Sequence, residues 1–237
     1  MYGYRERIGM ILPSTNTVAE QEFFRMAPSG VSTHVTRVKL TATNPEGLKA
    51  MADNARRATD EMMSCLADVI LYGCTSGSFL QGIEWEEKFR KELSAQAQRP
   101  VLTTANNCHR ALQALGKQKI SIATPYIDAL NQAAYRYYTD LGYDIVCMKG
   151  LGIETATNIG KNPPHAIYNL GKSAVTKETQ VLFLSCTGIR SIEILQQLQD
   201  DLGIPVFSSN VANLWACLRT HGINEKLNGL GALMQLP

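Results

Sequence analysis

The chain has 237 residues, of which 45% are hydrophobic and 19% charged, and its formal net charge is +2. This length allows one large domain or two small ones, and the composition is that of a globular protein with a sizeable core. The near-neutral charge gives no electrostatic reason to expect a nucleic acid or a membrane surface as a partner. No signal-peptide pattern opens the sequence and no apolar run reaches about 18 residues, so we expect a cytoplasmic protein.

Short apolar runs alternate with longer helical patterns along the whole chain. The runs predict strands near residues 8–12, 33–39, 68–73, 100–103, 119–123, 144–149, 180–185 and 204–207. The helical patterns cover residues 17–26, 46–66, 78–97, 105–115, 127–141, 163–176, 188–202 and 210–221. Strands that alternate with helices are typical of parallel sheets covered by helices on both faces, so we predict the α/β class.

The strand–helix sequence restarts after residues 115–118, and the second part resembles the first. Segments 8–14 and 69–78 return as 120–126 and 181–191, each 112 residues later, and 100–102 returns as 205–207 after 105 residues. We therefore predict two pseudo-symmetric α/β halves, residues 1–116 and 117–237, with the active site in the cleft between them. The last helix is expected to return and cover the first half.

A cysteine ends the same strand in both copies of the repeat. The first copy reads Gly73-Cys74-Thr75-Ser76 and the second reads Ser185-Cys186-Thr187-Gly188. Ligands of α/β proteins bind at the carboxyl ends of parallel strands, which is where both cysteines fall. A helix that begins after the strand favours the thiolate form of such a cysteine. We therefore expect two reactive thiols that face each other in one site.

The other four cysteines fit a structural role as small buried hydrophobes; they are Cys65, Cys108, Cys147 and Cys217. The sequence contains no CxxC pair and no clustered histidines, so it does not indicate a zinc site. We interpret the four histidines as structural; they are His34, His109, His165 and His221. The sequence contains no P-loop and no GxGxxG motif, so we expect no metal and no cofactor.

Polar residues follow other predicted strands as well. They occur in Pro13-Ser14-Thr15-Asn16-Thr17, Thr124-Pro125-Tyr126, Thr155-Ala156-Thr157-Asn158 and Ser208-Ser209-Asn210. The substrate-binding candidates are Asn16, Ser14, Thr75, Ser76, Tyr126, Asn158 and Thr187. Four of these have a structural alternative: Asn16 or Ser14 as a helix N-cap, Tyr126 as a packed aromatic side chain, and Asn158 as a turn residue. Arg190 either holds an anion, pairs with an acidic residue or faces solvent.

These motifs resemble the aspartate/glutamate racemase superfamily, and within it the maleate cis–trans isomerases and the related arylmalonate decarboxylases. The resemblance runs from Ile8 to about Gly222 and implies site roles for Asn16, Cys74, Tyr126, Asn158 and Cys186. The decarboxylases have glycine in place of Cys74, so the presence of both thiols favours an isomerase or racemase.

The resemblance implies a cofactor-independent isomerisation of maleate, or a close cis-enedioate, to fumarate. Cys74 would add to the alkene as nucleophile, Cys186 would donate a proton, and a succinyl-cysteine intermediate would rotate about its central bond. The implied partner is a small dicarboxylate, and a homodimer or homotetramer is usual for the family. Two alternatives stay open: a two-cysteine racemase or epimerase of an amino or hydroxy acid, and a non-catalytic dicarboxylate-binding protein.

Overall fold

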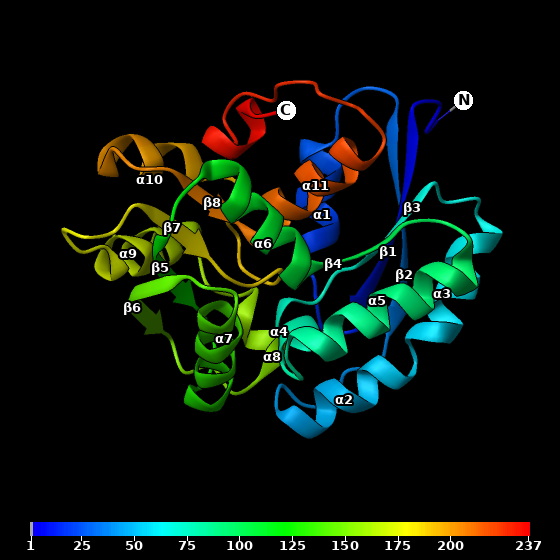
Figure 1. The fold of residues 1–237 in the computed structure, drawn as a ribbon, viewed down its shortest axis with the longest axis horizontal. Coiled ribbons are helices and arrows are strands. Elements are labelled where there is room, and N and C mark those ends of the chain that lie inside the picture. Colours follow the sequence, from blue (N-terminus) through cyan, green and yellow to red (C-terminus); the bar gives the residue numbers. More distant parts are fainter. Residues whose placement is uncertain (1) are drawn as a thin grey trace.

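Each half of the sequence builds its own four-stranded parallel sheet (Figure 1). The computed structural model describes residues 2–237. The strand order is β2-β1-β3-β4 in the first sheet and β6-β5-β7-β8 in the second, which is the same topology twice. The strands are β1 (Glu6–Pro13), β2 (Val31–Val38), β3 (Val69–Tyr72), β4 (Val101–Thr103), β5 (Lys119–Thr124), β6 (Asp144–Gly150), β7 (Val181–Leu184) and β8 (Val206–Ser208). The prediction of two pseudo-symmetric parallel-sheet α/β halves is confirmed.

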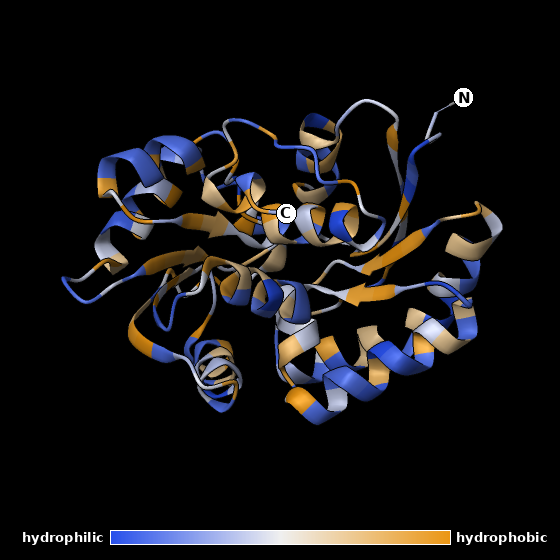
Figure 2. Ribbon diagram, turned by 45° about the horizontal axis from the view of Figure 1, so that its top comes forward, coloured by the Kyte–Doolittle hydropathy of each residue, from blue (hydrophilic) through white to orange (hydrophobic). Residues whose placement is uncertain are grey.

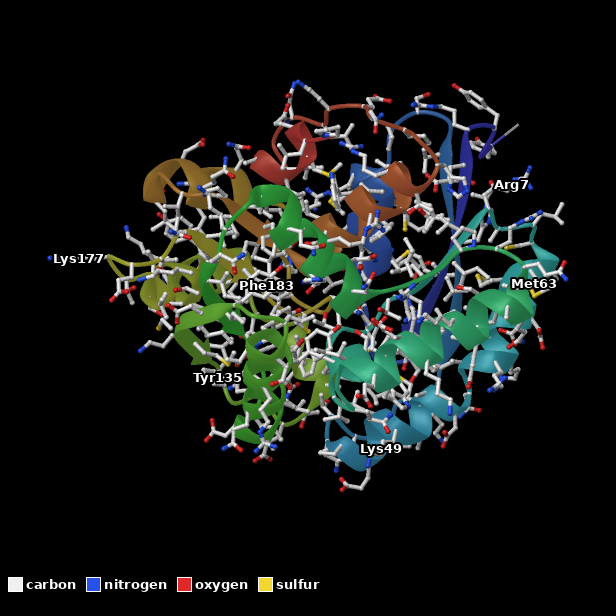
Figure 3. All side chains as sticks on the ribbon, viewed as in Figure 1. Arg7, Lys49, Met63, Tyr135, Lys177 and Phe183 are labelled. Atoms are coloured by element: carbon white, nitrogen blue, oxygen red, sulfur yellow. The ribbon has the colours of Figure 1, made fainter. Side chains whose placement is uncertain are left out.

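The most apolar runs of the sequence form central strands of the two sheets. All residues of β3 and β7 are buried, because each strand has a neighbour on both sides and helices over its faces. In Figure 2 the strands are mainly hydrophobic, whereas the helices carry hydrophilic residues on their outer sides. Phe183 of β7 lies inside the second half, while Lys177 and Met63 lie at opposite ends of the molecule (Figure 3).

Helices cover the sheets, and several depart from the predicted ranges. They are α1 (Ala19–Met26), α2 (Pro45–Asp53), α3 (Ala55–Ser64), α4 (Thr75–Phe79), α5 (Ile83–Ala97), α6 (Thr104–Leu115), α7 (Asp128–Asp140), α8 (Ala156–Ile159), α9 (Pro164–Ala174), α10 (Leu195–Leu202), α11 (Ser209–Thr220) and the 3-10 turn η1 (Ala232–Gln235). The helix predicted over 46–66 is divided at Asn54, and the one predicted over 78–97 is divided near Gly82, whose φ of +85° suits glycine.

The last long helix joins the two halves. Helix α11 follows β8 of the second sheet, yet it packs against α1, α6 and β3 of the first half. Buried amides connect α11 to α6, since the side chain of Asn107 donates to Asn213, which in turn donates to Thr104. Over residues 2–237, no helix combines the length and the apolar character that a membrane crossing needs.

Candidate active site

Cys74 is the N-cap of the short helix α4. Its Sγ atom accepts a hydrogen bond from the backbone N–H of Gly77 at 3.4 Å, and the Ser76 hydroxyl lies 3.9 Å from the same sulfur. The helix begins here because the extended backbone of Cys74 turns directly into the first turn of α4. The expected strand-to-helix corner is therefore present at this cysteine.

Cys186 occupies the equivalent strand end in the second half, but no helix starts there. Its Sγ accepts a hydrogen bond from the Gly188 N–H at 3.3 Å, and the chain runs through turns until α10 begins at Leu195. The helix predicted over 188–202 is thus wrong in its first half. The reason is tertiary: the N–H groups of Ser191 and Ile192 donate to the buried carboxylate of Glu22 on α1, at 2.6 and 3.1 Å.

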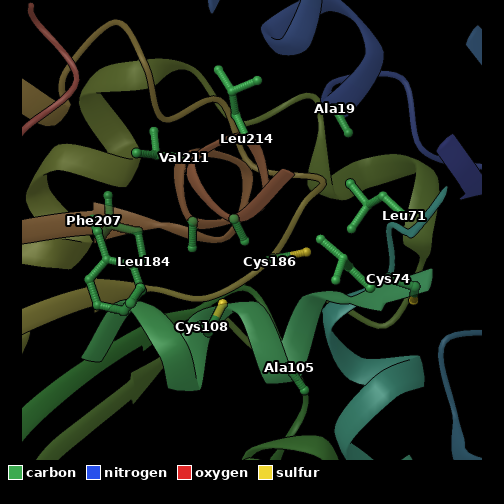
Figure 4. Close-up of a cluster of buried hydrophobic side chains, with 14 of the residues drawn as sticks. Ala19, Leu71, Cys74, Ala105, Cys108, Leu184, Cys186, Phe207, Val211 and Leu214 are labelled. Carbon is green, nitrogen blue, oxygen red and sulfur yellow. The ribbon is translucent and has the colours of Figure 1, made fainter. Parts of the chain in front are cut away.

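Thr187 ties the two cysteine segments together. Its hydroxyl donates to the backbone carbonyl of Gly73 at 3.2 Å and accepts from the side-chain amide of Asn16 at 3.0 Å. Thr187, which follows Cys186, is therefore hydrogen-bonded to Gly73, which precedes Cys74. Figure 4 shows Cys74 and Cys186 on segments that come from different halves. Both cysteines line one cavity.

The cavity is lined by small polar and apolar side chains. None of the described residues that line it is Asp, Glu, His, Lys or Arg. The lining consists of Pro13, Thr15, Asn16, Thr17, Leu40, Thr43, Cys74, Thr75, Ser76, Tyr126, Ala156, Ile159, Gly160, Cys186, Thr187 and Gly188. An anionic ligand in this cavity would be held by hydroxyl, amide and backbone N–H donors rather than by an ion pair.

Burial dominates the ionisation of both thiols. It raises the pKa of Cys74 to about 11 and that of Cys186 to about 12, and the hydrogen bonds from the N–H groups of Gly77 and Gly188 oppose the rise. Burial therefore opposes the thiolate that a strand-to-helix corner was expected to favour, because the loss of water around the sulfur outweighs the amides that face it. Ionisation needs further donors to the sulfur.

Three of the predicted binding residues also hold the scaffold. The side-chain oxygen Oδ1 of Asn16 accepts from the N–H groups of Val18 and Ala19 at the start of α1, while the Thr75 hydroxyl donates to Ser209 at 3.0 Å. The Thr187 hydroxyl donates its proton to the backbone carbonyl of Gly73. Asn16, Thr75 and Thr187 thus shape the cavity as well as line it.

The hydroxyl of Tyr126 has no such structural partner. Tyr126 is 2% exposed and lines the cavity; its Oη atom makes no hydrogen bond of good geometry within the described part of the chain, but it lies near Cys186, Ser185 and Thr75. Thr43, which is 8% exposed, lines the same cavity and has an equally unpartnered hydroxyl. Buried hydroxyls without partners are costly, so both are suited to donate to a ligand.

Ser14, Asn158 and Arg190 lie away from the cavity lining. The Ser14 hydroxyl accepts from the Leu40 N–H at 3.1 Å, and Asn158 is exposed on α8. Arg190 pairs with Glu193 at 3.2 Å, which is the ion-pair alternative. The four histidines are outside the lining as well. Across residues 2–237 there is no group of three or more His, Cys, Asp or Glu side chains that could hold a metal ion.

Sequence reasoning missed two residues of this region. Thr43 follows the second strand, so the rule that ligands bind at carboxyl ends could have found it. Glu22 gave no signal, because a glutamate on an amphipathic helix is ordinarily solvated. Here it is 3% exposed, and Asn210, which donates to it at 2.6 Å, also donates to the Thr187 carbonyl oxygen. Burial raises the pKa of Glu22, against the hydrogen bonds it accepts.

The duplicated sheets and the two cysteines that line one cavity are the features to compare with known proteins. A family model described as arylmalonate decarboxylase matches residues 8–234, so the chain belongs to this family. The resemblance seen in the sequence is thereby confirmed.

Proteins similar to this chain in sequence include enzymes. The maleate isomerase of Geobacillus stearothermophilus is 27% identical over 96% of both chains, and the arylmalonate decarboxylase of Bordetella bronchiseptica is 25% identical over 95% of both. Among solved structures, a mutant Nocardia farcinica maleate cis–trans isomerase with a covalently bound succinylcysteine intermediate matches with a TM-score of 0.93 and 25% identity. The match covers 97% of this chain and 98% of that one.

Proposed function

We propose that this protein is a cofactor-independent cis–trans isomerase of maleate or a close cis-enedioate. The observation that carries the proposal is the pair of thiols, one from each half, that line a single uncharged cavity. Similarity to maleate isomerases, one with a succinylcysteine intermediate, supports the same chemistry.

The reaction uses the two thiols in different roles. The Cys74 thiolate adds to one alkene carbon, and the π electrons move toward the carboxylate beside the other alkene carbon. Cys186 then donates its proton to that carbon, which leaves a thioether with a single central bond. After rotation, the Cys186 thiolate takes the proton back, the C–S bond breaks, and fumarate leaves with Cys74 again a thiolate.

The substrate carboxylates are held by neutral donors in this proposal. The hydroxyls of Tyr126, Ser76 and Thr43 and the amide of Asn16 surround the cavity. Asn158, carried over from the family resemblance, stays a candidate on the adjoining helix α8. Hydrogen bonds to a charged acceptor contribute about 1.5–3 kcal/mol each, so several are needed to replace the lost hydration of a dianion.

The test is incubation with maleate under reducing conditions, with fumarate followed by proton NMR. Cys74→Ala is expected to abolish turnover, and Cys186→Ala to lower it by at least a hundredfold. Since the second variant keeps the nucleophile, a Cys74 peptide that has gained the mass of one diacid is expected to accumulate. Inert maleate and inert related enedioates would refute the proposal.

The facing thiols also suit a racemase, in which they exchange a proton at one carbon. Solvent deuterium at the α-carbon of an amino or hydroxy acid, with no effect on maleate, would favour that function. If a dicarboxylate binds but no candidate reacts, and binding survives in both cysteine variants, the binding-protein alternative is favoured.

A further inference from the structure

The hydroxyl of Tyr72 is buried beside the candidate nucleophile and has no partner. Tyr72 ends strand β3 two residues before Cys74 and is 0% exposed. Its Oη atom makes no hydrogen bond within the described part of the chain. Such a group costs stability in the resting protein, so its place in the interior calls for a function.

Gly77 shows that the Tyr72 hydroxyl and the Cys74 sulfur face the same small space. A Cβ atom placed on Gly77 would lie 3.1 Å from Cys74 Sγ, 3.2 Å from Tyr72 Oη and 2.9 Å from Met51 Cε. A side chain at residue 77 would crowd both the sulfur and the hydroxyl, so glycine is needed where these two atoms approach the first turn of α4. The tyrosine ring is held in place by Phe89, which packs edge-on with ring centroids 5.0 Å apart.

We infer that Tyr72 is a positioning residue for Cys74, whose hydroxyl donates a hydrogen bond to the sulfur once the thiol becomes a thiolate. The Gly77 N–H and the Ser76 hydroxyl already approach that sulfur, and Tyr72 supplies a third donor. Burial raises the pKa of Tyr72 well above its ordinary value, so the phenol keeps its proton and acts as a donor.

The second cysteine has a different phenol near it, since the Tyr126 hydroxyl opposes the rise in the pKa of Cys186. Tyr72 pairs with Ile11 in the first sheet, and Leu184 pairs with Ala123 at the equivalent register of the second. The strand residue two positions before the cysteine is thus a phenol in one half and a hydrocarbon in the other. The two thiols therefore have different tyrosines beside them, so a change at Tyr72 is expected to act on Cys74 and not on Cys186. The assignment of Cys74 as nucleophile rests on the proposed function.

The experiment measures the reactivity of the two thiols directly, so its result does not depend on knowing the substrate. Iodoacetamide labelling of the full chain is followed between pH 6 and 10, and the Cys74 and Cys186 peptides are quantified by mass spectrometry. In Tyr72→Phe, the Cys74 profile is expected to move up by about one to two pH units, which is about ten- to a hundredfold slower labelling at neutral pH. Cys186 in the same molecule is expected to keep its wild-type rate.

Tyr138→Phe is the matched control. Tyr138 is also 0% exposed and its hydroxyl also lacks a hydrogen bond of good geometry, but it lies near Cys108 and outside the cavity lining. Neither substitution is expected to lower the urea midpoint, because each removes a buried hydroxyl that has no partner. A second variant, Gly77→Ala, places a methyl group between Cys74 and Tyr72 and is expected to slow Cys74 labelling in the same direction. Wild-type labelling of Cys74 in Tyr72→Phe, or an equal effect of Tyr138→Phe, would overturn the inference.

Discussion

Replacing Glu22 by glutamine takes one acceptor oxygen from a buried carboxylate that joins helix α1 to the segment after Cys186. One carboxylate oxygen accepts from the N–H groups of Ser191 and Ile192, at 2.6 and 3.1 Å. The other accepts from the side-chain amide of Asn210 at 2.6 Å. A glutamine can keep its oxygen on the Ser191 side, but its NH₂ group then faces the NH₂ group of Asn210.

The expected cost follows from that lost hydrogen bond. A buried donor left without its charged acceptor costs about 1–3 kcal/mol, so Glu22→Gln is expected to lower the free energy of unfolding by about 2 kcal/mol. Glu22→Ala also leaves the N–H groups of Ser191 and Ile192 unpaired and is expected to cost more. Because Asn210 also donates to the Thr187 carbonyl at 3.1 Å, the change reaches the residue beside Cys186.

Urea unfolding at neutral pH measures this cost as a lower midpoint at an unchanged slope. Glu20→Gln on the same helix is the control. Glu20 pairs with Arg37, and the two side chains are 27% and 37% exposed, so this variant is expected to lose less than about 1 kcal/mol. The reasoning is refuted if Glu22→Gln unfolds within about 0.5 kcal/mol of the wild type, or if Glu20→Gln loses as much.

Two further substitutions test packing and ionisation. Gly171→Ala on α9 would place its Cβ 2.8 Å from Leu198 and 3.2 Å from Leu182, so we expect a loss of about 1–2 kcal/mol in urea unfolding despite the better helix propensity of alanine; an unchanged or higher midpoint would contradict this packing argument. Burial raises the pKa of Glu6, beside His221, from 4.5 to about 7. Its contribution is complete below pH 4.5 and is lost as the pH rises through 7, so wild-type stability is expected to fall on the order of 2–3 kcal/mol more than that of Glu6→Gln over this window. Parallel stability curves would rule out this role for Glu6.

Local sequence patterns predicted the layers of the fold and the two cysteines. The continuous apolar runs before Cys74 and Cys186 became the buried strands β3 and β7, because a central parallel strand is covered on both faces. The same patterns failed in residues 188–194, where a helix was predicted but Glu22 accepts hydrogen bonds from the N–H groups of Ser191 and Ile192. They also did not single out Tyr72 as a residue of the site, since a tyrosine at the end of an apolar strand is typical of the hydrophobic core.

The sequence by itself determined the α/β class, the duplication and the strand ends at which both thiols lie, because these features depend on periodicity and on short-range order along the chain. Tertiary structure decided which groups surround each thiol. It brought Thr187 onto the carbonyl of Gly73, so that the two cysteine segments share one cavity. It also buried both sulfurs, which raises the pKa of each thiol. Such contacts join residues more than a hundred positions apart, and no local pattern encodes them.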